Sequence, residues 1–180
     1  WYNEATDPIS VLDQLKIRKS GAHIFTFMQK PPETAPKYNY HIEWDNVAAI
    51  PTDSFEKWWK SRIPKQTRTN IRRSEKKGVK IAVAEYNDEF VKGIQAIYNE
   101  SPLRQGKPFW HYHKSFDALK VMHASYLERS NFIGAYLEGE LIGFIKLVFS
   151  GKTARTMHII SMLKHRDKSP NNAMLAKAIE

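Results

Sequence analysis

The segment that most restricts the fold is residues 131–149, "NFIGAYLEGELIGFIKLVF". Two apolar runs meet at Glu138 and Gly139, which is the pattern of two strands joined by a tight hairpin turn. Residues 152–163, "KTARTMHIISML", continue with a third strand pattern. We therefore expect a sheet that is mostly antiparallel, with its apolar sides covered by other elements.

Helical patterns lie on both sides of this segment. Residues 88–101 begin with an acidic first turn and bring Phe90, Ile94 and Ile97 to one side, and residues 115–130 have a similar periodicity. A final helix begins at Ser169 as N-cap with Pro170 in its first turn. With a further strand over 79–86, the pattern predicts an α/β chain of the α+β type, a mixed, mostly antiparallel sheet flanked by helices.

The first 51 residues differ in composition. A short helical pattern at 8–15 is followed by two segments rich in β-branched and aromatic residues, 22–28 and 38–50, which we predict to be strands. The proline-rich segment 29–36 between them predicts an exposed loop. Residues 1–51 are thus expected to be a β-rich portion of the same fold unit or of a preceding one.

Composition restricts how the fold can be stabilised and where in the cell the chain is expected. The 180 residues are 42% hydrophobic and include no cysteine, so packing alone must hold the fold, without disulfides or thiolate metal sites. The sequence has no apolar run of 18 residues and no signal-peptide pattern at its start. These features predict a cytoplasmic protein without a membrane span.

Positive charge is concentrated in one region. The net charge is +9, and residues 52–80 contribute ten Lys or Arg against three Asp or Glu, a net +7 that leaves +2 for the rest. Within this region residues 65–77 form a helical pattern ending at Gly78. Its cations lie in columns, and like charges at such spacing repel unless an anion relieves them. We expect an anionic ligand to bind Arg68, Arg72, Arg73 and Lys76; a solvated surface is the alternative.

The start of the last predicted helix offers a second anion site. Backbone N–H groups at a helix N-terminus bind phosphate, and a basic segment, residues 164–168, stands directly before this helix. The candidate phosphate-binding residues are Lys168, Ser169, Asn171 and Asn172. The alternative is that Ser169 only caps the helix.

The order of these motifs resembles a known family. "RTNIRRSEKKGVKI", then "SPLRQGKPF", "GAYLEGELIGFIKLV" and "DKSPNNAMLAKAIE" together resemble the GNAT acyltransferase superfamily in its FemAB-like branch. There a basic helix precedes the acyltransferase core, and an S-P-N segment opens the helix after the fourth core strand. The resemblance covers roughly residues 52–180 and implies a GNAT-like core that is incomplete at its C-terminal end.

The resemblance implies an enzyme that transfers an acyl group to an amine. The donor would be acetyl-CoA or another acyl-CoA, or aminoacyl-tRNA, and the acceptor a small molecule or a cell-wall precursor. "HRDKSPNNA" contains no glycine, so the Gly-rich pyrophosphate loop common in the superfamily has no counterpart here. Both donor classes therefore stay open.

Direct attack by an amine on the donor carbonyl requires a base, an oxyanion site and an acid for the leaving group. The candidate catalytic bases are His111 and His113, in the segment "PFWHYHK", and His158, in the third predicted strand. On a regular strand His158 would share a face with Thr156 and Ile160. We expect no metal, because the His111–His113 pair has no obvious third ligand nearby.

Two other readings compete with the enzyme. A non-catalytic nucleic-acid-binding module could use the basic helix 65–77, although residues 65–79 contain no aromatic side chain for base stacking. A degenerate acyltransferase fold could serve as an interaction surface, and it would bind no donor.

Overall fold

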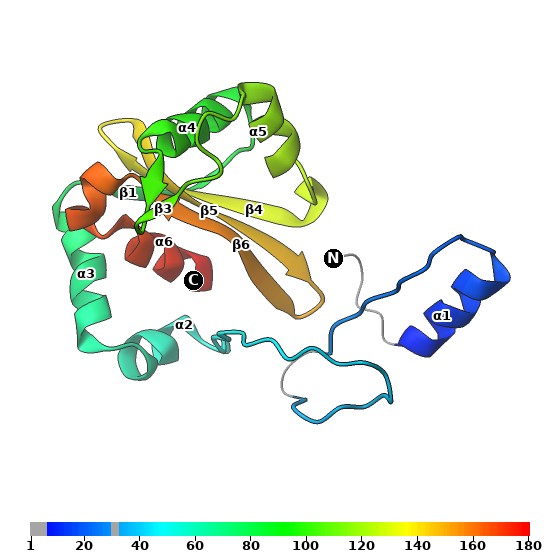
Figure 1. Cartoon of the computed structure of the whole chain (residues 1–180). Helices are drawn as coiled ribbons and strands as arrows, with labels where there is room; N and C mark the ends of the chain where they lie inside the picture. The colour runs from blue at the N-terminus through cyan, green and yellow to red at the C-terminus, as the bar shows by residue number, and fades with distance from the viewer. Residues whose placement is uncertain (1–6, 30–32) are drawn as a thin grey trace. The chain divides into compact units, whose positions relative to one another are not determined.

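A computed structural model describes residues 7–29 and 33–180 of the chain (Figure 1). It consists of two compact units, Trp1–Ile50 and Pro51–Glu180. Within the described residues no helix is long and apolar enough to cross a membrane.

The N-terminal unit contains one regular element among its described residues, helix α1 (Pro8–Ile17). The helix begins after Asp7, whose carboxylate accepts hydrogen bonds from the backbone N–H groups of Ile9 and Ser10. The prediction of strands over 22–28 and 38–50 is wrong, because both segments lack β structure. Aromatic rings from the two segments contact one another, but a strand requires a backbone ladder as well. Residues 30–32 of the proline-rich segment lie outside the described residues.

The C-terminal unit is built on a four-stranded sheet. Its strands are β1 (Lys80–Ala84), β4 (Ser130–Leu137), β5 (Glu140–Ser150) and β6 (Thr153–Ser161), in the order β1-β4-β5-β6, and every pair is antiparallel. Glu138 and Gly139 form the β4–β5 turn with φ of +51° and +87°, which confirms the predicted hairpin. The mostly antiparallel sheet flanked by helices is likewise confirmed.

Helices cover both faces of this sheet (Figure 1). Helices α4 (Asp88–Asn99) and α5 (Phe116–His123) lie on one face, and α6 (Pro170–Ile179) lies on the other. As predicted, α4 buries Phe90, Ile94 and Ile97 in the core. Helix α5 ends earlier than predicted, because the chain turns at Tyr126, which has a φ of +58°. A 3₁₀ turn, η2 (Leu127–Arg129), then leads into β4.

The basic segment is helical, as predicted. Helix α2 (Phe55–Lys57) runs into a π-helix, η1 (Trp58–Arg62), and α3 (Lys65–Lys76) follows and packs against α6. Gly78, with a φ of +79°, ends this region at the left-handed position where glycine is favoured. Two-residue strands β2 (Leu103–Arg104) and β3 (Lys107–Pro108) lie between α4 and α5, and a 3₁₀ helix, η3 (Leu163–Lys168), joins β6 to α6.

Candidate functional site

His158 lies inside the C-terminal unit, on the sheet face covered by α4 and α5. The β5–β6 ladder pairs Lys146 with His158 but Leu147 with Thr156, so β6 contains one extra residue, Met157, between two consecutive pairs. Such a bulge turns the following side chains to the opposite face. The predicted shared face of His158 and Thr156 is therefore wrong, whereas Ile160 stays on the His158 side.

Two further side chains of the cluster come from α4 and α5. The His123 ring lies 4.7 Å from the His158 ring, centroid to centroid, and is fully buried. The hydroxyl of Tyr98 lies 3.2 Å from Nε2 of His123. Phe144 of β5 packs against all three rings. A tyrosine and two imidazoles are thus held together by the packing of two helices on the sheet.

The structure separates the two candidate histidines of the loop before α5. His111 stacks on Tyr98 at 4.8 Å and lies 6.1 Å from the His158 ring, so it belongs to the cluster. Its Nε2 accepts a hydrogen bond from the indole N–H of Trp110 at 2.9 Å, so the neutral ring carries its proton on Nδ1. His113 is exposed; its backbone N–H donates to the side-chain oxygen of Asn99, and its ring lies against that of Tyr112, which is outside the cluster.

Burial keeps these imidazoles neutral. It lowers the pKa of His123 to about 3 and that of His158 to about 4, and the positive charge of Lys146 acts in the same direction on both. Burial also lowers the pKa of His111 and raises the pKa of Tyr98. At pH 7 the cluster therefore consists of neutral groups that can accept or pass a proton.

Lys146 is the one cation buried with these rings among the described residues. Its side chain is 1% exposed, and Nζ donates to the backbone oxygens of His123 at 2.8 Å and Ser125 at 2.5 Å. A third hydrogen bond reaches the Ser125 hydroxyl at 3.2 Å. Burial lowers the pKa of Lys146, and the charge of Glu128 opposes this shift.

The residues predicted to bind a donor phosphate lie together at the start of α6. Ser169 has a φ of +54°, and its side chain does not form the predicted N-cap hydrogen bond. Lys168 approaches His165 and forms an ion pair with Asp167. The side-chain oxygen of Asn171 is buried and has no hydrogen-bond partner among the described residues. That oxygen is an unsatisfied acceptor at the helix start.

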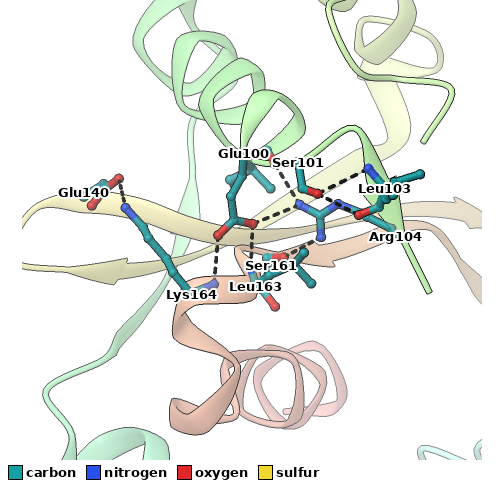
Figure 2. A network of polar contacts seen from close by, with 9 residues as sticks. Glu100, Ser101, Leu103, Arg104, Glu140, Ser161, Leu163 and Lys164 are labelled. Carbon is teal, nitrogen blue, oxygen red and sulfur yellow. Dashed lines mark hydrogen bonds and ion pairs between the residues drawn. The ribbon is translucent and has the colours of Figure 1, made fainter. Parts of the chain in front are cut away.

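A carboxylate already occupies the first turn of η3. Figure 2 shows Glu100, at the end of α4, accepting hydrogen bonds from the backbone N–H groups of Leu163 at 2.5 Å and Lys164 at 2.8 Å. Arg104 holds the same carboxylate at 3.4 Å and donates to the carbonyl oxygen of Ser161 at 2.8 Å. The turn after β6 therefore binds an anion, and the internal Glu100 carboxylate fills it.

The four basic residues predicted to share an anion are not equivalent. Arg68 donates to the carbonyl oxygens of Trp59 and Ile63, both at 2.9 Å, so its guanidinium ties η1 to α3. Arg72 lies over the ring of Trp59 at 5.9 Å. Arg73 and Lys76 are exposed on α3. Among the four, Arg73 and Lys76 therefore direct their charges to solvent, whereas the neighbouring Lys77 pairs with Asp167 at 2.6 Å.

Sequence reasoning missed Tyr98, His123 and Lys146 as members of the cluster. Tyr98 and His123 occupy core-facing positions of their helices. The helical pattern of the sequence marks such positions as buried, but it does not show that their polar atoms meet another polar group. Lys146 carried a usable signal, because it is a single cation inside the apolar run "LIGFIKLVF" of an expected central strand.

No group of three His, Cys, Asp or Glu side chains in residues 7–29 and 33–180 is arranged so that it could hold a metal ion, and this includes the three imidazoles of the cluster. A hollow in the N-terminal unit is lined by side chains from the segment between Leu12 and Phe25, and none of the candidate site residues is among them.

Comparisons with known proteins are sparse. No protein-family model matches the chain, and no curated protein matches it. A crystal structure of a functionally unknown conserved protein from Staphylococcus epidermidis ATCC 12228 is similar at a TM-score of 0.43 and 13% sequence identity. The match covers 63% of this chain and 42% of that protein, so this chain spans less than half of the neighbour's length.

Proposed function

We propose that the C-terminal unit is the core of an N-acyltransferase of GNAT-like, FemAB-like type. The observation that carries the proposal is the position of His158, a neutral imidazole on a bulged strand that faces the loop between α4 and α5. The order of elements supports it, because β1, two helices, three antiparallel strands and α6 follow one another as the resemblance implies.

The reaction needs no covalent enzyme intermediate. The acceptor amine attacks the donor carbonyl, a C–N bond forms, and the C–S bond of a thioester or the C–O bond of an aminoacyl ester breaks. His158 takes the proton from the nitrogen after attack, when the nitrogen bonded to the carbonyl carbon is more acidic than in the free amine. The protonated His158 returns its proton, directly or through solvent, to the leaving thiolate or alkoxide, and becomes neutral again.

The α6 start is the proposed contact for the phosphates of acyl-CoA. Lys168 supplies a charge there, and Asn171 and Asn172 lie in the first turn of the helix. Asn171 also brings the unsatisfied side-chain oxygen described above, which can accept a hydrogen bond from a ligand N–H or hydroxyl. His111 and the adjoining loop form the proposed acceptor side.

Ligand-dependent melting tests this function. The melting temperature of the full chain is measured with acetyl-CoA, with coenzyme A and with a tRNA mixture, each at two salt concentrations, because a ligand that binds only the folded state raises it. Stabilisation by acetyl-CoA supports a thioester donor. Stabilisation by tRNA alone points to aminoacyl transfer or to the nucleic-acid module, and no stabilisation by any of the three contradicts the enzyme and favours the degenerate fold.

Variants at the start of α6 test whether the acyl donor binds there. Asn171→Glu with Asn172→Glu should abolish the stabilisation by acetyl-CoA, because added carboxylates repel phosphate, while cooperative melting of the unliganded variant shows that it is folded. Asn131→Glu, on the exposed start of β4, is the matched control and should bind as the wild type does. Unchanged binding in the double variant would exclude the α6 start as the donor site.

A further inference from the structure

The buried position of Lys146 in the sheet is energetically unfavourable for a cation. Its ammonium is buried on β5 between Phe132 of β4 and His158 of β6, and no carboxylate of the described residues forms an ion pair with it. Burial of an unpaired charge costs several kcal/mol, whereas a methionine would fill similar space at no such cost. A role beyond filling space is therefore indicated.

The contacts of Lys146 join the two imidazoles. Its Nζ holds the backbone oxygens of His123 and Ser125, at the end of α5. Its own backbone is paired with His158 across the β5–β6 ladder. One side chain thus links the backbone that carries His123 to the strand that carries His158, whose rings lie 4.7 Å apart.

We propose that Lys146 is a positioning residue of the acyl-transfer site, which clamps the end of α5 to the sheet and so holds the His123 ring against His158. The inference rests on the proposed function. All three N–H bonds of the ammonium are used by His123 and Ser125, so no donor is left for a substrate. Lys146 acts through the imidazoles.

The charge of Lys146 has a second effect on the same rings. It lowers the pKa of both His123 and His158, in addition to burial. The other ionisable groups facing His158 are His111 from the loop and His123 from α5, and Tyr98 of α4 reaches it only through the latter. Within residues 7–29 and 33–180 no carboxylate acts on His158, so a protonated His158 gains no counter-charge there and the neutral form is favoured.

Histidine titration by NMR tests this inference without any substrate. In Lys146→Met, the pKa values of His158 and His123 should each rise by roughly one unit or more, because a nearby positive charge is lost. Lys152→Met, on the exposed β5–β6 turn, is the control and should titrate as the wild type does. Unchanged titration of both imidazoles in a folded Lys146→Met protein would overturn the proposal.

A milder variant covers the case in which Lys146→Met does not fold. Ser125→Ala removes one acceptor of the ammonium and keeps the charge, so amide hydrogen exchange at the end of α5 should accelerate several-fold. Exchange and titration both identical to wild type would overturn the clamp. Donor-induced stabilisation of the wild type is measured separately, and its absence would refute the acyltransferase while the histidine result stands by itself.

Discussion

The guanidinium of Arg68 donates a hydrogen bond from Nη1 to the backbone oxygen of Trp59 at 2.9 Å. The bond crosses from α3 to the π-helix η1, whose last carbonyl groups have no partner within that helix. The sequence pattern predicts that the charge of Arg68 binds an anionic ligand. In the structure this charge stabilises a helix end instead.

Arg68→Met should lower the free energy of unfolding by about 2 kcal/mol, because charge-assisted hydrogen bonds to carbonyl groups are lost. The loss should hardly depend on salt, since the bonds are partly buried. Arg73→Met, an exposed position on the same helix, is the control and should stay within about 0.5 kcal/mol of wild type. Urea denaturation at two salt concentrations measures both, and equal effects of the two variants would contradict the assignment.

The buried imidazoles predict loss of stability in acid. The pKa values of His123 and His158 in the folded state, about 3 and about 4, lie below the ordinary value of 6.5, so the unfolded chain binds protons first as the pH falls. The free energy of unfolding should therefore be largest above pH 6.5 and decrease between pH 6.5 and 4. At pH 4 the loss is on the order of 3 kcal/mol for the fully buried His123 and smaller for His158, which is partly exposed to solvent.

Denaturation measured from pH 7 to pH 4 checks this loss. His123→Gln removes one titrating group and should flatten the pH dependence, although it lowers stability at pH 7. Lys152→Gln, on the exposed β5–β6 turn, is the control and should leave the slope between pH 7 and pH 4 unchanged. A wild-type stability that is constant across this range would refute the buried neutral cluster.

Glu100→Gln should loosen the connection between β6 and α6. The substitution keeps an acceptor but removes the charge that two backbone N–H groups and Arg104 share, so we expect a loss of about 1–3 kcal/mol. Amide exchange at Leu163 and Lys164 should become faster. Glu85→Gln, on the exposed segment after β1, is the control, and equal exchange in both variants would show that the carboxylate is dispensable.

Gly93→Ala tests the close packing of α4 on the sheet. A Cβ at this position would lie 2.7 Å from Cδ2 and 2.9 Å from Cβ of Leu141, so the helix or the strand must shift. Overpacking of this kind costs about 1–3 kcal/mol, more than alanine gains over glycine in a helix. Thermal denaturation beside the exposed control Lys92→Ala measures it, and a stabilised Gly93→Ala protein would contradict the close contact.

Local patterns in the sequence were sufficient for most elements of the C-terminal unit. Helix α3 (Lys65–Lys76) is followed by Gly78 in the predicted left-handed position, the β4–β5 hairpin turns at Glu138 and Gly139, and α4 buries the predicted side chains. Each of these depends on periodicity or on the backbone preference of single residues. The strand predictions for the aromatic segments of the N-terminal unit were wrong, because residues that favour strands do not by themselves supply a neighbouring strand to hydrogen-bond with.

The sequence by itself determined the sheet, its helices and the concentration of positive charge before the sheet. Only the tertiary structure decided which polar residues meet. Tyr98, His111, His123, Lys146 and His158 come from five different segments, and the β6 bulge and the packing of α4 and α5 bring them together. Tertiary contacts likewise decided that Arg68 binds carbonyl groups and that Glu100 fills the turn after β6, because hydrogen bonds between distant segments leave no periodic signal in the chain.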